Sequence, residues 1–285
     1  MAPQSPARAL PATQEVGARS SESCQGSTVL AEPSRDCIAL DFDGVLCDSA
    51  RETAISAWRA GRQLWPEWSG EAPSAAAVAR FLEVRPWLET GYQAIVMMRM
   101  IADGAPDSAF AEDLEGHCQR VLGATRLQRQ DLVRLFGQAR DEWLRRDEAG
   151  WLAAHEFYPG VVEAVRSAQE RADVVVITTK QERFARALLE SRGVRLAEDR
   201  LYGLERGRSK TAILGDLMAR SGPAARFHFV EDRAETLRQV LAEPALAGVR
   251  LFYAAWGYGT PADLAWARRE PRVRVWSLDE FLVLD

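Results

Sequence analysis

Two aspartates separated by one residue, Asp41 and Asp43, are the feature of this sequence that most clearly suggests chemistry. They follow a short apolar run at residues 37–40, and Gly44 comes directly after them. An apolar run that ends in polar residues is typical of a buried strand that leads into a turn. Side chains at positions i and i+2 of a strand share a face, and glycine lets the backbone turn sharply. The pattern therefore predicts two carboxylates side by side at the end of a buried strand.

The same pattern, an apolar run followed by polar residues, recurs later in the chain. It occurs at residues 174–177 before Thr178, at 227–230 before Glu231 and Asp232, and at 249–253 before a glycine-rich loop at 257–259. Helical patterns lie between these runs, at about residues 160–171, 181–192, 209–220 and 233–243. Strands that alternate with such helices favour the α/β class, here a Rossmann-like, mainly parallel sheet with helices on both faces. In that fold the polar residues at the strand ends converge on one edge, where ligands bind.

Residues 48–157 interrupt this alternation and predict an all-helical cap inserted after the first strand. The segment has no convincing strand pattern and contains six of the nine tryptophans. Five of its residues fall at helical spacing on one face: Leu132, Leu135, Phe136, Ala139 and Trp143. We interpret the aromatic residues as packing rather than as a cofactor-binding surface. Residues 36–47 and 158–285 then form the catalytic core.

Residues 1–35 differ from the rest in composition. They are rich in Ala, Ser, Pro, Gln and Glu and contain no aromatic residue and no isoleucine. Such a segment buries too little apolar surface to offset the entropy of ordering, so we expect a disordered tail. A transit peptide to a plastid is the alternative, which two arginines and several serines suit and three glutamates oppose.

The overall composition excludes several classes of function. With 36 Lys plus Arg, 41 Asp plus Glu and a net charge of -5, the chain has no broad basic field for nucleic acid. No apolar run approaches the roughly 18 residues that span a bilayer, so no membrane span is expected. The four cysteines have neither paired zinc-site spacing nor the density of a disulfide scaffold, which favours a cytoplasmic location. The composition leaves the oligomeric state open.

Four motifs, in this order along the chain, resemble those of the haloacid dehalogenase superfamily. They are Asp41-Phe42-Asp43-Gly44-Val45-Leu46, Thr178 after the second core strand, Lys210 at the start of a helix, and the pair Glu231-Asp232. The resemblance covers about residues 37–285. It is closer to the phosphoglycolate-phosphatase-like branch, through residues 158–161, 178–180, 184–186 and 256–259. It is closest to an uncharacterised plant and cyanobacterial group of such hydrolases, through residues 84–86 and 229–233, and that group supplies no substrate.

The resemblance implies a phosphatase that acts on a small phosphorylated metabolite, and phosphoryl transfer itself suggests the roles. Asp41 suits the nucleophile, because a carboxylate can attack phosphorus and form an aspartyl-phosphate. Asp43 suits the general acid and then the base. The dehalogenases of the superfamily lack this second aspartate, which argues against carbon–halogen cleavage. Thr178 can donate its hydroxyl to a phosphoryl oxygen, and Lys210 adds a positive charge beside the nucleophile and the phosphate.

A divalent cation is the cofactor that the acidic residues predict. Asp41, Glu231 and Asp232 would crowd like charges at one edge of the sheet unless a cation compensates them. Mg²⁺ accepts carboxylate, carbonyl, water and phosphate oxygens. The predicted ligands are the side chains of Asp41 and Asp232 and the backbone carbonyl of Asp43, with Glu231 acting through water. The superfamily often has glycine at the position of Glu231, and a further acid where this chain has Thr236.

Four other residues are predicted to bind the substrate. They are Arg85, Glu89 and Tyr92 in the inserted segment, and Thr179 beside Thr178. A solvated helix face is the alternative for the first three. Lysine is rare in this chain, and Lys180 has two interpretations: a cation close to the site, or a helix-capping or solvent-exposed residue.

Two other functions remain open at this stage. A phosphomutase shares every motif and differs in whether water or a sugar hydroxyl accepts the phosphoryl group. A catalytically silent binding protein on a phosphatase scaffold belongs to a different class. The second is disfavoured because Asp41, Asp43, Lys210 and Asp232 are all present.

Overall fold

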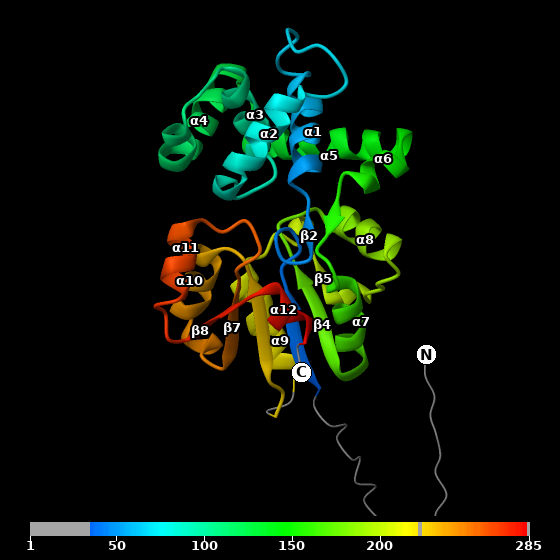
Figure 1. The fold of residues 1–285 in the computed structure, drawn as a ribbon, viewed down its shortest axis with the longest axis vertical. Coiled ribbons are helices and arrows are strands. Elements are labelled where there is room, and N and C mark those ends of the chain that lie inside the picture. Colours follow the sequence, from blue (N-terminus) through cyan, green and yellow to red (C-terminus); the bar gives the residue numbers. More distant parts are fainter. Residues whose placement is uncertain (1–34, 222–223, 284–285) are drawn as a thin grey trace, which may run out of the picture. The chain divides into compact units, whose positions relative to one another are not determined.

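The computed structural model describes residues 35–221 and 224–283, so the tail predicted for residues 1–35 lies outside the described residues except for Arg35. Within the described residues the central element is a six-stranded sheet with the order β5-β4-β1-β6-β7-β8 (Figure 1). All of its neighbouring strands are parallel. The strands are β1 (Asp36–Leu40), β4 (Ala172–Ile177), β5 (Leu201–Tyr202), β6 (Phe227–Glu231), β7 (Val249–Ala254) and β8 (Val273–Trp276).

Strand β1 lies at the centre of the sheet, and this position explains its apolar sequence. Leu40, its last residue, is aligned with Val176 of β4 and with Val230 of β6. Ile38 and Leu40 belong to the core on one face of the sheet, whereas Cys37 and Ala39 belong to the core on the other face. Because the neighbouring strands run in the same direction, the residues that follow β1, β4 and β6 meet at one edge.

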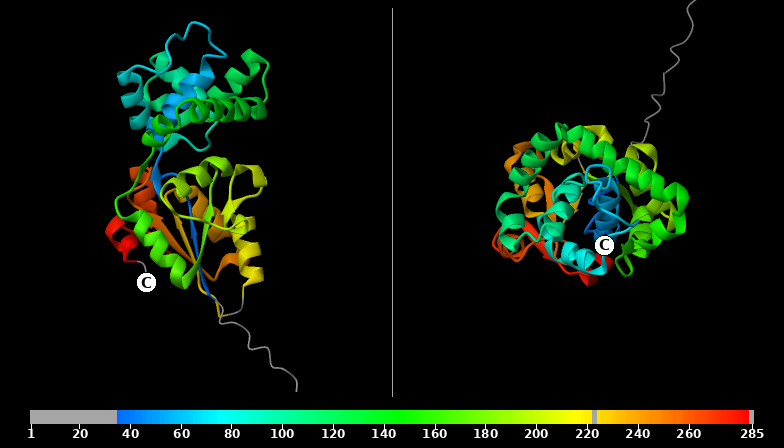
Figure 2. Two further views of the ribbon diagram at one scale, coloured as in Figure 1. Left: turned by 90° about the vertical axis from the view of Figure 1, so that its right-hand side faces the viewer. Right: turned by 90° about the horizontal axis from the view of Figure 1, so that it is seen from above.

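Helices cover both faces of the sheet, which confirms the predicted fold class (Figures 1 and 2). One core contains residues from α7 (Val161–Arg171), α8 (Glu182–Ser191) and α12 (Leu278–Leu282). The opposite core contains residues from α9 (Lys210–Arg220), α10 (Ala234–Ala242) and α11 (Pro261–Ala267). Short 3-10 helices occur at η2 (Glu198–Arg200), η3 (Leu204–Arg206) and η4 (Pro244–Leu246).

Residues 50–153, all of which the structure describes, form six α-helices and have a separate core; we call them the helical segment. The helices are α1 (Ala50–Gly61), α2 (Ala75–Val84), α3 (Gln93–Ala102), α4 (Asp107–Thr125), α5 (Arg129–Arg146) and α6 (Glu148–Ala153), with η1 (Arg85–Trp87) after α2. The core of this segment includes Phe81, Ile95 and Met97, which are fully buried. The helical segment therefore packs largely around its own apolar side chains, whereas Trp143 of α5 and Trp151 of α6 belong to a core of the sheet.

The sequence patterns missed four of the strands that the described residues contain. Strands β2 (Cys47–Asp48) and β3 (Glu156–Phe157) form a short antiparallel pair where the chain enters and leaves the helical segment. Strand β5 has two residues, and a two-residue strand is too short to show alternation. Strand β8 has four residues, of which two are buried.

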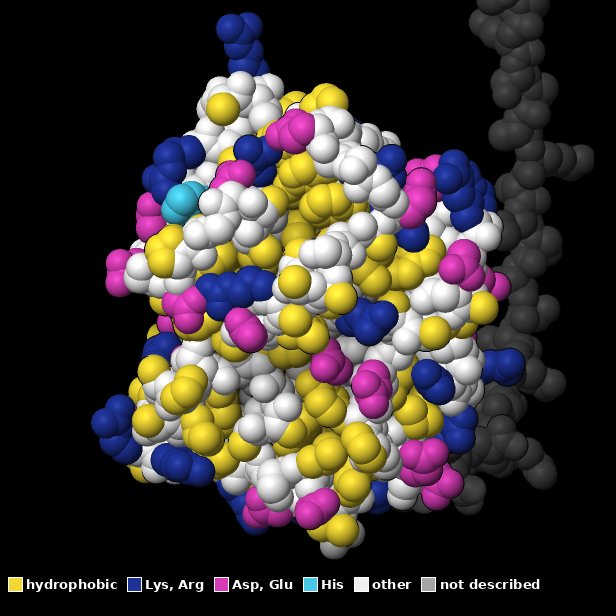
Figure 3. Space-filling model, turned by 45° about the horizontal axis from the view of Figure 1, so that its top comes forward, with side chains coloured by type: hydrophobic (Ala, Val, Ile, Leu, Met, Phe, Trp, Pro, Cys, Tyr) yellow, Lys and Arg dark blue, Asp and Glu magenta, His cyan; other side chains and the backbone are white. Residues whose placement is uncertain are grey.

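The surface combines charges of both signs. On the face shown in Figure 3, basic and acidic side chains are interspersed. Paired charges also occur among the described surface residues: Arg183 contacts Asp141 at 2.7 Å and Glu205 at 3.1 Å. Among residues 35–221 and 224–283, no helix combines the length and apolar character that crossing a membrane requires.

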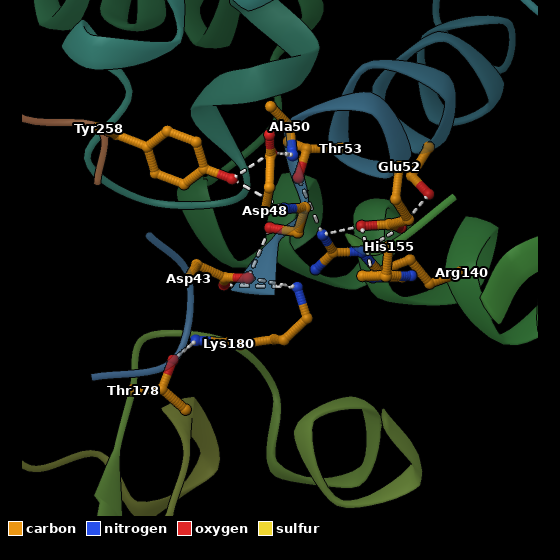
Figure 4. Close-up of polar contacts among 12 residues, drawn as sticks. Asp43, Asp48, Ala50, Glu52, Thr53, Arg140, His155, Thr178, Lys180 and Tyr258 are labelled. Atoms are coloured by element: carbon orange, nitrogen blue, oxygen red, sulfur yellow. Dashed lines mark hydrogen bonds and ion pairs between the residues drawn. The ribbon is translucent and has the colours of Figure 1, made fainter. Parts of the chain in front are cut away.

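A buried ion-pair cluster joins α1 to α5 in the helical segment (Figure 4). Arg140 donates from Nε and Nη2 to the two carboxylate oxygens of Glu52, at 2.8 and 2.6 Å. Ser56 Oγ donates to Glu52 at 2.5 Å, and His155 Nε2 lies 3.5 Å from the same carboxylate. Burial opposes ionisation of Glu52, but Arg140 and His155 hold its pKa well below the ordinary value. The cluster thus contains an ionised carboxylate with well-aligned partners.

We expect Glu52→Gln to destabilise the protein strongly at neutral pH. Arg140 would remain buried without a carboxylate, and losing one partner of a buried pair costs about 3–5 kcal/mol. The control Glu142→Gln removes an exposed partner of Arg146 on α5. It should cost less than about 1 kcal/mol.

The pH dependence of this effect has a definite sign. The folded pKa of Glu52 lies below its ordinary value of 4.5, so its contribution is full above about pH 4.5 and declines as the pH falls further. In urea unfolding, the difference between wild type and Glu52→Gln should be constant from about pH 7 to pH 5.5 and shrink below about pH 4.5. A difference that is the same at every pH would contradict an ionised Glu52.

Candidate active site

The two aspartates of the first motif follow β1 in a tight turn. The N–H of Asp41 donates to the carbonyl of Val230 at 3.0 Å, which extends the pairing of β1 with β6 by one residue. The turn closes when the N–H of Gly44 donates to the carbonyl of Cys47 at 2.9 Å. Asp41 is buried and Asp43 is partly buried. The sequence prediction of two neighbouring carboxylates at this strand end agrees with this geometry.

Lys210 connects Asp41 to Glu231. Its Nζ lies 2.7 Å from Asp41 Oδ1 and 2.8 Å from Glu231 Oε2. Lys210 is the first residue of α9, which Ser209 caps by accepting a hydrogen bond from the N–H of Ala212. Burial disfavours the charged form of Lys210, but the two carboxylates hold its pKa above the ordinary value. This lysine is therefore a fixed cation between the ends of β1 and β6.

Asp232 approaches the turn after β1 very closely. Its Oδ2 accepts a hydrogen bond from the N–H of Tyr258 at 2.7 Å. Its Oδ1 is buried and has no hydrogen-bond partner among the described residues. Gly44 has a φ of +92°, and a Cβ there would collide with the carboxylate of Asp232. Glycine at position 44 thus permits both the backbone conformation and the approach of Asp232.

Three buried carboxylates form a potential metal site. Oxygens of Asp41, Glu231 and Asp232 lie within 4.8 Å of one another. Burial raises the pKa of Asp41 to about 7. The negative charge of Glu231 adds to this rise, and the positive charge of Lys210 opposes it. Burial also raises the pKa values of Glu231 and Asp232, and each has a neighbouring carboxylate that adds to the effect. The raised pKa values indicate that burial and mutual repulsion of the carboxylates outweigh the effect of Lys210.

The residues present fit Mg²⁺. The unpartnered Oδ1 of Asp232 lies in a cluster of hard oxygen donors, the type that this ion prefers. Glu231 differs from the other two acids because both of its oxygens already have partners. Oε2 contacts Lys210, and Oε1 accepts hydrogen bonds from the N–H groups of Asp232 and Arg233. Asp41 and Asp232 are therefore better placed than Glu231 to offer side-chain oxygens to an ion.

Asp43 has a different set of partners from Asp41 (Figure 4). Lys180 Nζ donates to its two oxygens at 3.0 and 3.3 Å, and Ser49 Oγ donates at 2.5 Å. Burial opposes ionisation, but Lys180 and Ser49 hold the pKa of Asp43 below its ordinary value. Lys180 is only 3% exposed, so the interpretation of it as a solvent-exposed residue is wrong.

The predicted substrate-binding residues fall into two cavities. The cavity that contains Asp41, Asp43 and Asp232 is also lined by Arg85, Glu89 and Thr179. Tyr92 lines an adjoining cavity instead. Thr178 is buried at the end of β4, where its Oγ1 accepts a hydrogen bond from the N–H of Lys180 at 3.0 Å.

Tyr258 and Arg140 are two of the residues that line the carboxylate cavity and that sequence reasoning missed. Tyr258 donates from its hydroxyl to Asp48 at 2.7 Å and lies under the guanidinium of Arg85, 3.9 Å from the ring centre. Tyr258 lies in the glycine-rich loop that follows an apolar run, and this position in the sequence indicates that Tyr258 lies at this edge of the sheet. Arg140 also lines the cavity, but it is one of several arginines on α5 and has no distinguishing sequence signal.

A parallel sheet with an acidic edge and a helical insertion after its first strand is the architecture of a class of α/β hydrolases. The family model for haloacid dehalogenase-like hydrolases matches residues 35–237. The chain belongs to this family.

Solved structures with the same fold come from several bacteria. A predicted phosphatase from Clostridium acetobutylicum has a TM-score of 0.54 and 14% sequence identity, over 88% of this chain and 97% of that chain. A predicted phosphoglycolate phosphatase from Haemophilus somnus 129PT has a TM-score of 0.53 and 17% identity, again over 88% and 97% of the two chains. At these identities the likeness shows the fold alone. No curated protein matches the chain.

We expect Gly44→Ala to be more destabilising than the same change at Gly104. Both glycines have positive φ, but a Cβ at Gly104 would meet no atom within 4 Å. Gly104→Ala should therefore cost only the left-handed backbone penalty of about 1–2 kcal/mol. Gly44→Ala should cost more, because Asp232 must move. Urea unfolding of both variants measures the difference, and equal losses would show that Asp232 can move freely.

Proposed function

We propose that this protein is a Mg²⁺-dependent phosphatase that hydrolyses a small phosphomonoester metabolite through an aspartyl-phosphate on Asp41. The observation that carries the proposal is the difference between the two aspartates after β1. Asp41 shares Lys210 with Glu231, whereas Asp43 contacts Lys180 and Ser49. Two carboxylates in one cavity with separate partners suit two separate roles. Both solved structures compared above are described as predicted phosphatases, in agreement with this proposal.

Asp41 would attack the phosphorus atom. Its carboxylate is buried at the strand end, which raises its pKa to about 7, and Lys210 at 2.7 Å favours the ionised, nucleophilic form against that effect. The same ammonium lies close enough to offset negative charge on the phosphoryl oxygens. Mg²⁺, held by Asp41, Asp232 and the backbone carbonyl of Asp43, would supply additional positive charge for those oxygens. Glu231 would keep Lys210 in place and contact the ion only through water.

Asp43 would transfer protons at the leaving oxygen. It would give a proton to the departing alcohol and then take one from the water that splits the aspartyl-phosphate. Lys180 and Ser49 stabilise its ionised form, which is the form that the second step needs. In the first step, the negative charge of an entering phosphate would offset Lys180 and allow Asp43 to hold its proton.

Thr178, Thr179 and the helical segment would complete the site. Thr178 Oγ1 accepts one hydrogen bond, which leaves its proton available to a phosphoryl oxygen. Arg85 and Glu89 belong to the helical segment, yet they line the same cavity as Asp41 and Asp43. We therefore propose that residues 48–157 act as a cap over a catalytic core made of residues 36–47 and 158–285.

A panel of small phosphorylated metabolites, assayed with and without Mg²⁺, tests the proposed reaction. Release of inorganic phosphate from at least one compound, only when Mg²⁺ is present, would support it. Transfer of the phosphoryl group to a sugar without phosphate release would favour a phosphomutase instead. No turnover of any compound would contradict both enzymatic functions.

Binding of Mg²⁺ should stabilise the folded chain, and Asp232→Asn should reduce this effect. A ligand that binds only the folded state adds about 2.7 kcal/mol at a hundredfold excess over its Kd. The metal-free variant should be no less stable than wild type, because one of the crowded charges is removed. Thermal unfolding with and without Mg²⁺ measures both effects, with the exposed Asp199→Asn as the control. Equal Mg²⁺ shifts in wild type and Asp232→Asn would remove Asp232 from the ligand set.

Substitutions of the two motif aspartates should have different effects on the formation of the phosphoenzyme. Asp41→Asn removes the attacking group, so no phosphoenzyme should form with any substrate. Asp43→Asn should still react with acetyl phosphate, because acetate leaves without protonation, but water attack should become slow.

The Asp43→Asn variant should therefore accumulate one phosphate per chain, visible by mass spectrometry on the peptide that contains Asp41. The adduct should be stable in acid and labile in alkali. The thermal unfolding midpoint of Asp43→Asn shows whether this variant is folded. This control is needed because the substitution leaves Lys180 without its carboxylate partner. A folded Asp43→Asn variant with no adduct, or with the adduct on another residue, would refute the assigned roles.

A further inference from the structure

A second cavity adjoins the one that contains the carboxylates. Four residues line both cavities: Thr90, Gly91, Arg140 and Thr179. Much of the remaining lining of the second cavity is apolar and comes from Tyr92, from Val133 and Phe136 of α5, and from Leu204 of η3. Because these four residues line both, the two cavities are immediate neighbours.

The two cavities differ in size. The space beside the carboxylates is about 50 Å³, whereas the second cavity has about 160 Å³. The smaller space suits a group the size of a phosphoryl group, since a cavity needs about 10–15 Å³ of such space for each water. An apolar cavity of about 150 Å³ in another protein holds benzene. The second cavity therefore fits a group of the size of a six-membered ring.

Arg140 presents a hydrogen-bond donor in the shared wall. Its Nε and Nη2 bind Glu52, and its Nη1 makes no hydrogen bond to any residue that the structure describes. The guanidinium also lies 4.1 Å above the ring centre of Phe136, so its orientation is fixed from two sides. Arg129 lines the second cavity as well, but its Nη2 already pairs with Glu115 at 3.1 Å, and none of the described residues that line this cavity is acidic. The Nη1 donor of Arg140, which does not contact Glu52, therefore favours an oxygen acceptor on the ligand.

Two other polar atoms in this wall lack partners. Thr90 Oγ1 and Gln181 Oε1 are buried and have no hydrogen-bond partner among residues 35–221 and 224–283. Both residues line the second cavity, and Thr90 also lines the first. A buried polar atom without a partner costs free energy, which a bound molecule would recover only if the side chain turned toward the cavity. The second cavity thus combines an apolar floor with a few unpaired polar groups, as small-molecule sites do.

We propose that the second cavity binds the leaving group of the substrate, and that the substrate is the phosphomonoester of a ring-sized, largely apolar alcohol with an oxygen acceptor for Arg140. This inference rests on the proposed phosphatase function. A substrate as small as phosphoglycolate would leave the second cavity empty.

Filling the second cavity tests its role. Val133→Trp places a large side chain in the cavity. Leu135→Trp is the matched control, because Leu135 is on the same helix, is also partly buried, and lines neither cavity. The readout is kcat/KM for phenyl phosphate divided by kcat/KM for acetyl phosphate. This ratio should fall about tenfold in Val133→Trp and stay within about twofold of wild type in Leu135→Trp.

The outcomes separate this inference from the proposed function. An unchanged ratio in Val133→Trp, or an equal fall in Leu135→Trp, would overturn the leaving-group cavity while acetyl phosphate hydrolysis keeps the phosphatase function intact. If wild type hydrolyses neither compound nor any member of the metabolite panel, the phosphatase function fails and this inference fails with it.

A second comparison tests whether the substrate has an oxygen acceptor for Arg140. Wild type should prefer at least one of the three carboxyphenyl phosphates over phenyl phosphate by about tenfold in kcat/KM. Arg140→Lys keeps a cation beside Glu52 but lacks Nη1, so this preference should disappear. Absence of any preference in wild type would overturn the acceptor requirement, whether or not Arg140→Lys folds. A preference that persists in folded Arg140→Lys would overturn the role of Arg140.

Discussion

The crowding of buried carboxylates at one edge of the sheet is the constraint on which the rest of the structure depends. Parallel strands bring Asp41, Glu231 and Asp232 within 4.8 Å of one another, where burial raises the pKa of each. Such a cluster requires positive charge in a small space. The chain has only two lysines, Lys180 and Lys210, and each contacts an aspartate of the first motif. A compact ammonium can enter this space, whereas the planar guanidinium of arginine needs more room.

The same edge of the sheet also fixes how the helical segment is attached. Ser49 donates its Oγ to Asp43 and its backbone N–H to the hydroxyl of Tyr258, and Tyr258 in turn donates to Asp48. Asp48 belongs to β2 and Ser49 immediately precedes α1, so the chain enters the helical segment through hydrogen bonds to the site. A change in the position of α1 must therefore disturb the partners of Asp43. This coupling links the proposed cap to Asp43, the residue proposed to transfer protons.

The sequence predicted the parts of this fold that have a local pattern. Apolar runs located β1, β4, β6 and β7, and polar residues at their ends located the acidic edge. Strands β2, β3 and β5 have two residues each, so no periodicity could reveal them. No sequence pattern marks Arg140 as a residue of the cavity, for a different reason. Its partner Glu52 lies 88 residues away, and only tertiary packing distinguishes this buried arginine from the exposed ones on the same helix.

The proposed role of Arg140 in binding the leaving group would link stability to selectivity in this protein. Its ion pair with Glu52 joins α1 to α5, while the same guanidinium forms part of the wall between the two cavities. A buried pair of this kind is costly to form and costly to break, because removal of either partner leaves a charge without compensation. Single substitutions at this wall would therefore lower stability before they altered the choice of substrate. Substitutions of Val133 and Phe136 in the apolar lining would change selectivity with a smaller loss of stability. These residues carry no charge, so a substitution there changes only the volume of the cavity.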